Sequence, residues 1–342
     1  MDKKVYIIIL NYNGWKDTIE CLESVLKNNY KNYQIIVVDN DSPNNSMEYL
    51  IKWAEGKQEV IYDENSKLKY LSQPPEHKPL EYIYYTKEEA LQGGNQKREL
   101  ELNNPIIFIQ AGENGGFAAG NNIGIKYALA KDDFEYICLL NNDTVVENDF
   151  LSKIVKKMIN DKNIGICGGK INYYDEPNKI WFNGGYFNKF IARTIHYDYN
   201  KIDNGQHQTN PINFLTGCLW VMKKDVIEKV GLLNEDYFMY VEDLEYSYET
   251  IKAGYILDIE SKAKIYHKVG ASSDGEASEF SAYWMMRNRL FFINKHLPFV
   301  YRLISISFIV FTRLIQFSKW YIQGSSKIIY AQLKGFKEVI FR

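Results

Sequence analysis

The chain has 342 residues, of which 46% are hydrophobic and 25% are charged, so it is long enough for one large or two modest globular domains. Its net charge of −2 provides no basic excess of the kind that nucleic-acid-binding proteins use. The charge is uneven, because eight Lys or Arg face a single acid, Glu338, from Lys295 onward, which leaves about −9 for the rest. This asymmetry predicts an acidic body and a basic end that meets an anionic surface.

Alternating apolar runs and helical spacings dominate the first half of the chain. They predict strands at 5–10 and 34–38 and helices at 17–28 and 47–54. Residues 55–104 are charged and contain Pro74-Pro75 and Gly93-Gly94, so we interpret them as an insertion with a short helix near 86–92. The pattern then resumes with strands at 105–110, 136–140, 164–171 and 214–222, and helices at 118–130, 150–160, 224–230 and 242–253. This order predicts an α/β fold with a mostly parallel sheet.

The cysteines and the N-terminal residues indicate the cellular compartment in which the protein is expected. Three of the four cysteines lie in apolar runs and none forms a C-x-x-C pair, which favours reduced core residues of a cytosolic protein: Cys21, Cys138, Cys167 and Cys218. The chain starts directly with a predicted strand and shows no apolar leader, so no export is expected.

The C-terminal part, 299–317, is rich in Ile, Phe and Leu. Its longest charge-free stretch, 303–312, has ten residues, whereas a membrane-spanning helix needs roughly 20. The pattern therefore favours a helix lying in the membrane interface, and the alternative is a helix packed on the protein's own core. Six residues are expected at headgroup level: Arg302, Arg313, Lys319, Tyr301, Trp320 and Tyr321.

Polar segments follow four of the predicted strands, at 11–14, 39–42, 113–122 and 141–144. Ligands of open parallel sheets bind at the carboxyl ends of the strands, so four polar ends in sequence predict a shared site. Asp39 is suited to a base N–H or a ribose hydroxyl, and the alternative is an Asx-turn. Asp143 is suited to a divalent cation that also holds a diphosphate, and the alternative is an ordinary turn.

The segment 113–122 is glycine-rich and opens a helix, which lets the backbone approach an anionic ligand. It is not a G-x-G-x-x-G after the first strand, which argues against a dinucleotide oxidoreductase.

An aromatic run, 237–240, precedes the acid pair Glu242-Asp243 at the start of a helix. A carboxylate there would deprotonate an acceptor hydroxyl, and the alternative is a partner for the helix dipole. His267 is either a metal ligand or a polar core residue.

In order and spacing these segments resemble family 2 glycosyltransferases of the GT-A fold, and within them the rhamnosyltransferase-like branch. The resemblance covers 5–54 and 105–289. It rests on I-I-L-N-Y-N-G (8–14), V-V-D-N-D-S (37–42), E-N-G-G-F-A-A-G-N-N (113–122), L-L-N-N-D-T (139–144), F-L-T-G-C (214–218), E-D-L-E-Y (242–246) and H-K-V-G-A-S (267–272).

The resemblance implies a role for each matching residue. Asp243 would be the catalytic base, and Asp143 with His267 would hold Mg²⁺ or Mn²⁺. Asp39 would read the uracil or thymine ring, in a nucleotide site that also contains Asn11, Asn13, Asn40, Gly115 and Asn142. The sugar and acceptor would face Asn121, Thr216, Gly217 and Glu242. Asn141 departs from the family pattern, because many members have there the first aspartate of D-x-D, and this departure bears on metal affinity.

The implied protein is a Rossmann-like GT-A domain over 1–290, with a mixed, mostly parallel sheet flanked by helices, and a basic amphipathic helical tail over 291–342. It would transfer a sugar, with inversion, from a pyrimidine nucleotide donor such as dTDP-rhamnose to a glycan or lipid-linked acceptor. Its expected place is the cytoplasmic face of the cell membrane, in cell-surface polysaccharide biosynthesis.

Two other functions compete with this one. A sugar-nucleotide nucleotidyltransferase would carry a loop rich in Gly and Lys near the N-terminus, but 11–17 holds one of each. A non-catalytic carbohydrate-binding protein on the same fold would not need Asp39, Asp143 and Asp243, which are all present.

Overall fold

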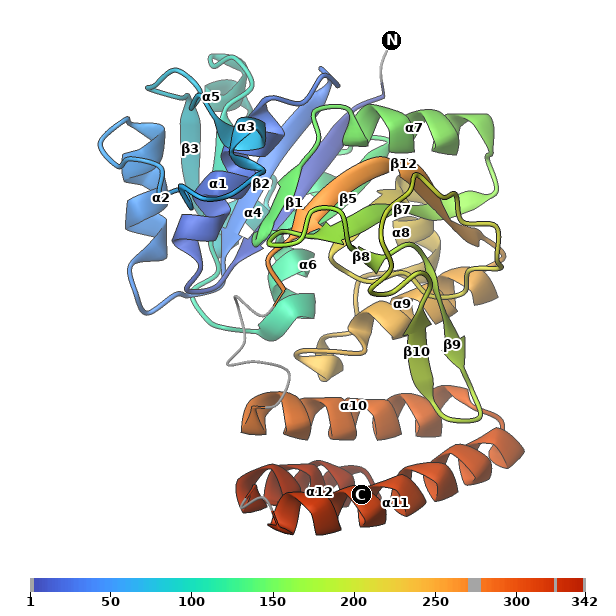
Figure 1. Ribbon diagram of the computed structural model, residues 1–342. Coiled ribbons are helices and arrows are strands. Elements are labelled where there is room, and N and C mark those ends of the chain that lie inside the picture. Colours follow the sequence, from blue (N-terminus) through green and yellow to red (C-terminus); the bar gives the residue numbers. More distant parts are fainter. Residues whose placement is uncertain (1–2, 270–277, 323–324, 341–342) are drawn as a thin grey trace.

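The computed structural model describes residues 3–269, 278–322 and 325–340, and its centre is a large mixed sheet (Figure 1). Within these residues the sheet has ten strands in the order β3-β4-β2-β1-β5-β11-β7-β12-β6, with β8 beside β7. The strands are β1 Val5–Asn11, β2 Tyr33–Asp39, β3 Tyr82–Thr86, β4 Ile106–Gln110, β5 Tyr136–Asn141, β6 Thr144–Val146, β7 Ile164–Tyr173, β8 Ile180–Phe182, β11 Leu219–Lys223 and β12 Ile256–His267.

One antiparallel strand, β11, interrupts the parallel order in the middle of the sheet. The strands from β3 to β5 are all parallel, whereas β11 is antiparallel to both β5 and β7. Beyond it, β7 and β12 are again parallel, and β6 and β8 are antiparallel edges. The predicted mixed, mostly parallel sheet is therefore confirmed.

Helices cover both faces of the sheet. Side chains alternate along β1, so Ile8 lies against Gly124 of α6 (Gly116–Lys131), and Asn11, on the other face, accepts a hydrogen bond from Thr18 of α1 (Trp15–Leu26). The apolar interior is a continuous cluster that includes the four cysteines, which are buried and free. The other helices of the body are α2 Ser46–Ala54, α3 Lys69–Ser72, α4 Lys87–Leu91, α5 Gln96–Leu100, α7 Phe150–Asn160, α8 Lys224–Val230, η1 Glu235–Tyr237 and α9 Glu242–Lys252.

No strand was predicted within 55–104, and the structure has one there. Residues 82–86 form the edge strand β3, which pairs in parallel with β4. Ile83 and Tyr85 are buried and Tyr84 and Thr86 are exposed, the alternation of a strand with one covered face. The strand has only five residues, and the charged residues on both sides of it make its alternation difficult to recognise in the sequence. The predicted strand at 214–222 was also too long, because residues 214–218 form a loop before β11.

Three C-terminal helices form a layer beside the body (Figure 1): α10 Glu279–His296, α11 Phe299–Ile322 and α12 Ser326–Ile340. The boundary expected at residue 290, between the catalytic domain and the C-terminal tail, lies inside helix α10. The hairpin of β9 (Gly185–Asn188) and β10 (Arg193–His196) reaches this layer, where the rings of Phe187 and Phe292 lie 5.1 Å apart and those of Phe190 and Tyr301 lie 5.3 Å apart. The layer is thus attached to the body by side-chain packing.

Helix α11 exposes an apolar stripe. Its Phe299–Ser318 part has 20 residues and a mean hydropathy of 1.5, is 11% buried, and by length and composition alone could cross a membrane. The two arginines predicted at headgroup level make hydrogen bonds within the layer of C-terminal helices. Arg302 donates to the carbonyl of Asn294 and Arg313 to Gln332, because both side chains are half-buried toward α10 and α12. The exposed stripe consists of Phe299, Val300, Leu303, Ile304, Val310, Phe311, Leu314, Ile315 and Tyr321.

Candidate active site

The carboxyl ends of β1, β2 and β5 bring three predicted polar segments together. The parallel register pairs Asn11 with Asp39 and Leu10 with Asn141, so the segments that follow these strands begin side by side. This arrangement follows from the sheet order β2-β1-β5, in which the first strand of the chain lies in the middle.

Asp39 is 1% exposed, and both of its carboxylate oxygens accept hydrogen bonds. Its carboxylate accepts hydrogen bonds from Asn11 Nδ2 at 2.5 Å, Ser42 Oγ at 2.6 Å and Gln110 Nε2 at 3.2 Å. It also accepts one from the backbone N–H of Ser42 at 3.1 Å, which is the local turn considered as the alternative. Asp39 therefore organises the end of β2, and its contact with a nucleotide base stays a prediction.

The other amides predicted for the nucleotide site extend this network. Asn142 Nδ2 donates to Thr18 Oγ1 at 2.9 Å and lies 3.5 Å from Asn11 Oδ1. The backbone N–H of Asn13 donates to Ser42 Oγ at 2.8 Å, and Asn13 has a left-handed backbone with φ of 59°. These side chains cross-link the ends of β1, β2 and β5.

Asn40 connects β2 to the glycine-rich segment. Its Nδ2 donates to Asn114 Oδ1 at 2.9 Å, and its Oδ1 accepts from the backbone N–H of Gly115 at 3.3 Å. The next residue, Gly116, has φ of +81°, and a Cβ there would lie 2.1 Å from the carbonyl oxygen of Phe238. Glycine is required at this position by both backbone conformation and space.

Asp143 and His267 meet at the far end of the same edge. His267 Nε2 lies 3.1 Å from Asp143 Oδ1, and both side chains are almost fully buried. Burial alone lowers the pKa of His267, but the Asp143 carboxylate and the Cys218 thiol outweigh it and raise this pKa well above its ordinary value. His267 is therefore a buried imidazole paired with a carboxylate, and its role as a metal ligand stays a prediction.

Within residues 3–269, 278–322 and 325–340, no group of three His, Cys, Asp or Glu side chains is arranged to hold a metal ion. Asp143 and His267 nevertheless have suitable chemistry, because Mg²⁺ commonly takes one or two protein ligands and completes its shell with substrate phosphates and water. The last residues of the quoted H-K-V-G-A-S segment, 270–272, lie outside the described residues.

Asp243 lies in the first turn of α9 and is partly exposed. Its carboxylate accepts hydrogen bonds from the backbone N–H of Gly217 at 3.2 Å and of Leu244 at 2.8 Å. Burial raises its pKa, and these two donors oppose that rise. In Glu242, burial and then the charge of Asp243 raise the pKa well above normal. The two donors favour the charged form of Asp243, and burial favours the neutral form of Glu242.

Asp143 and Asp243 are joined through the loop before β11. The backbone N–H of Asn141 donates to the Cys218 carbonyl at 3.0 Å, and the preceding Gly217 contacts Asp243. Thr216, in the same loop, is 8% exposed. Hydrogen bonds thus link Asp39 through Asn11 to Asn142, the neighbour of Asp143, and link the backbone of Asn141 through the Cys218–Gly217 loop to Asp243. Sequence proximity could not have shown that these three acids share one edge.

Asn121, predicted to face sugar or acceptor, is turned into its own helix. It is 2% exposed and donates to the carbonyl of Phe117 at 2.9 Å. The prediction missed Thr18 and Gln110. Gln110 ends β4 just as Asp39 ends β2, so the rule of polar strand ends would have identified it. Thr18 lies inside α1 and carries no such signal.

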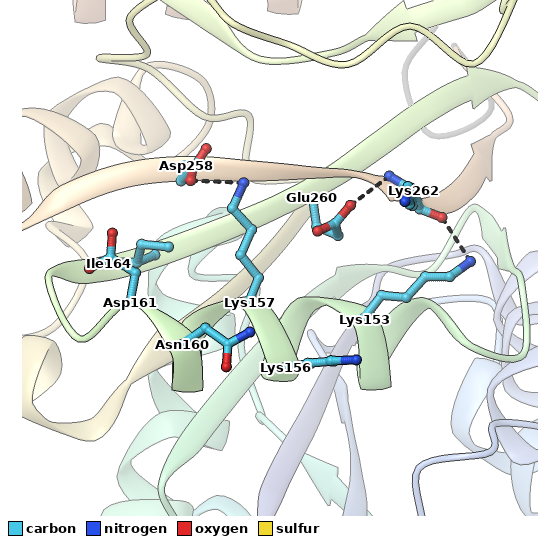
Figure 2. A pocket seen from close by; sticks show the side chains of 9 residues that line it. All are labelled: Lys153, Lys156, Lys157, Asn160, Asp161, Ile164, Asp258, Glu260 and Lys262. Carbon is cyan, nitrogen blue, oxygen red and sulfur yellow. Dashed lines mark hydrogen bonds and ion pairs between the residues drawn. The ribbon is translucent and has the colours of Figure 1, made fainter.

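A pocket of about 470 Å³ lies away from this edge, between α7 and the first half of β12 (Figure 2). Two of its lysines have partners within the pocket, since Lys157 Nζ lies 2.8 Å from Asp258 and Lys153 Nζ lies 2.9 Å from the Lys262 carbonyl. His267 ends β12 five residues after Lys262. The pocket contains none of the predicted site residues.

Comparisons with known proteins concern the sequence and the fold of the chain. The profile described as Glycosyl transferase family 2 matches residues 6–73 and 91–231. The dTDP-rhamnosyl transferase RfbF of Shigella flexneri is 28% identical over 254 residues, which cover 68% of this chain and 79% of that protein. The low-salt glycan biosynthesis hexosyltransferase Agl10 of Haloferax volcanii is 23% identical over 191 residues, which cover 54% of this chain but only 59% of Agl10.

The fold also resembles that of the mannosyltransferase PcManGT from Pyrobaculum calidifontis, solved in complex with GDP-Man and Mn²⁺. The TM-score is 0.54 at 12% identity, over the whole of this chain and 88% of that one. At this identity the likeness concerns the fold alone.

Proposed function

The chain belongs to glycosyl transferase family 2, and on that premise we propose that it is an inverting hexosyltransferase that uses a pyrimidine nucleotide sugar. The first candidate donor is dTDP-rhamnose, and the proposed acceptor is a glycan or lipid-linked glycan of cell-surface polysaccharide biosynthesis. The observation that carries the proposal is the hydrogen-bonded set of segments that brings Asp39, the Asn141–Asp143 turn and Asp243 to one region of the molecule. The name of the relative RfbF supports the donor class.

In this proposal Asp243 is the general base. It takes the proton of an acceptor hydroxyl as that oxygen attacks the anomeric carbon, and the bond from that carbon to the nucleotide diphosphate breaks in the same displacement. Gly217 N–H and Leu244 N–H fix the carboxylate and favour its charged form. Burial and the charge of Asp243 raise the pKa of Glu242, which favours its neutral form and disfavours a second charge beside the base.

Asp143 and His267 are the residues that would hold Mg²⁺ or Mn²⁺. When bound, such a cation supplies neutralisation of the charge that develops on the leaving diphosphate. Asn141 is neutral where a second carboxylate would stand, so we expect the cation to depend more strongly on the phosphates for its binding.

The base assignment predicts how transfer depends on pH. Burial raises the pKa of Asp243 to about 6. Because only the ionised carboxylate accepts a proton, we expect kcat to be constant above this pKa and to fall about tenfold per pH unit below it. Initial rates at saturating donor between pH 4.5 and 8 test this expectation. A rate that rises as the pH falls through this range would contradict it.

The proposal is tested by nucleotide release from a panel of dTDP-, UDP- and GDP-sugars with Mg²⁺ or Mn²⁺ and a polyprenyl-diphosphate-linked sugar as acceptor. We expect release from a dTDP- or UDP-sugar that requires the acceptor. Release of pyrophosphate from a nucleoside triphosphate and a sugar phosphate would identify a nucleotidyltransferase instead. Sugar binding without release would identify a non-catalytic protein.

We also propose that the C-terminal layer contacts the cytoplasmic face of the cell membrane. The support is the exposed stripe of α11 in a tail that carries eight Lys or Arg and one acid. Apolar side chains would enter the interface while basic residues meet anionic headgroups. The buried directions of Arg302 and Arg313 leave the lipid-facing side of the helix free of their charge.

Replacing Phe311 and Leu314 by Asp tests this contact. These side chains are 64% and 66% exposed, and each full burial in lipid contributes about 1.5–3 kcal/mol, so partitioning onto phosphatidylglycerol-containing vesicles should fall at least tenfold. Leu100→Asp is the control, since Leu100 is 78% exposed on the body. Unchanged vesicle binding, or a change only in self-association, would refute the contact.

A further inference from the structure

The backbone that leads into the acid pair is unusual. In the segment 237–241, Phe238, Tyr240 and Val241 have φ values of +57°, +68° and +73°. Residues with a side chain rarely adopt such values, and a β-branched residue such as Val241 is a clear outlier. Conformations of this kind persist only where surrounding contacts impose them. Glu242 and Asp243 follow at once, so whatever holds this segment also sets the direction of the carboxylates.

Asn288 of α10 is the group that holds it. This side chain is completely buried, and its Nδ2 lies 2.6 Å from the carbonyl oxygen of Tyr237, 2.8 Å from that of Met239 and 2.9 Å from that of Tyr240. One amide group thus lies within hydrogen-bond distance of three carbonyl oxygens in four consecutive residues. The contact joins the C-terminal layer to the segment that carries the acid pair, over about fifty positions of sequence.

The orientation of the Asn288 amide is itself fixed. Arg287 Nη1 donates to Asn288 Oδ1 at 2.7 Å, so the NH₂ group must face the carbonyls. The same guanidinium nitrogen donates to the Asp236 carbonyl at 2.6 Å, just before the strained segment. On the other side, the backbone N–H of Phe117 donates to the Phe238 carbonyl at 2.6 Å. The segment is therefore clamped between the start of α6 and the middle of α10.

We propose that Asn288 is a positioning residue for the transfer reaction, which acts by holding 237–241 in the conformation that aims Asp243 at the acceptor. This inference rests on the proposed function, because it takes Asp243 as the base. It assigns to the C-terminal layer a part in catalysis that is separate from membrane contact.

The test is Asn288→Asp, which keeps the size of the side chain but turns an oxygen toward three carbonyl oxygens. A small misplacement of a reacting group costs about 100-fold, so we expect kcat to fall by that factor. The donor KM should stay within about threefold, because Asn11, Asp39 and Asn142 lie on other elements. Asn294→Asp is the control, since Asn294 accepts the hydrogen bond from Arg302 of α11 through its backbone carbonyl, which the substitution keeps.

Hydrogen exchange provides a readout that needs no activity. In the Asn288→Asp protein, amides of 237–246 should exchange at least tenfold faster, whereas those of β1 and β5 should not change. If that variant does not fold, Asn288→Ser keeps one donor and should show the same changes to a smaller degree. A folded variant with unchanged kcat and unchanged exchange would overturn the proposal, as would equal losses of kcat and donor affinity. Failure of the wild-type protein on every donor would refute the proposed function instead, while the exchange experiment still decides whether Asn288 holds the segment.

Discussion

Asp243→Asn should reduce kcat roughly 1,000-fold while leaving donor affinity within about threefold of the wild-type value. General-base catalysis contributes about 10²–10⁴-fold, and an amide cannot accept the acceptor's proton. The shape of the side chain is kept, and its Oδ1 still accepts the hydrogen bond that Gly217 N–H gives to Asp243. Single-turnover transfer with radiolabelled donor and calorimetric binding of the nucleotide measure the two quantities separately.

Asp236→Asn is the matched control for this change. Asp236 is exposed and lies in η1, seven residues earlier, where its backbone, not its carboxylate, contacts Arg287. It should transfer at the wild-type rate. Transfer by Asp243→Asn within about threefold of wild type would show that another group takes the proton.

Asp143→Asn should lower kcat/KM about 100-fold, chiefly through weaker binding and stabilisation of the diphosphate. Loss of about 3 kcal/mol of charge stabilisation corresponds to that factor. The fall should be partly reversed at high Mg²⁺ or Mn²⁺, because the amide oxygen is a weaker ligand, not an absent one. Initial rates over a metal titration measure both effects. Asp149→Asn, in which a surface carboxylate that pairs with Lys153 is changed, is the control.

The same variant has a second readout in the metal-free protein. The Asp143 carboxylate raises the pKa of His267, so its removal should lower that pKa, and the imidazole should lose its proton at a lower pH than in the wild type. Histidine NMR titration measures the shift. An unchanged His267 titration together with an unchanged metal dependence would separate Asp143 from the site.

The sheet could be predicted from sequence where strands and helices alternate with strong patterns. The runs at 5–10 and 34–38 fall inside β1 and β2, and the helix at 224–230 matches α8. Patterns failed where packing between distant segments decides the structure. β12 alternates polar and apolar residues over Ile256–His267, but its partners β7 and β6 lie far away in sequence, and the strand was not predicted.

The candidate site, like the sheet, could be predicted from the sequence only in part. The rule of polar strand ends located Asn11, Asp39 and Asn142 correctly, because parallel strands deliver their carboxyl ends to one edge. It could not show that Asp39 already accepts four hydrogen bonds, nor that Asn121 turns into its own helix. Such outcomes depend on side-chain geometry, which residue type does not fix.

Asn288 illustrates the limit most clearly. In the sequence it is one polar residue in a helix with Trp284, Met285 and Met286 before it, and nothing in the spacing connects it to residues 237–240. Its role depends on α10 packing against the body and on a backbone conformation that the residues Phe238 and Val241 would not predict. Strain of this kind runs against local preference, so local sequence rules miss it.

The most direct test of the account is a crystal structure with dTDP or UDP and Mn²⁺. We expect the diphosphate and the cation to lie beside Asp143 and His267, the pyrimidine ring to lie at the Asp39 end of the edge, and Asp243 to face the space beyond the diphosphate. A nucleotide bound elsewhere, for example in the pocket between α7 and β12, with the edge of the sheet empty, would contradict it.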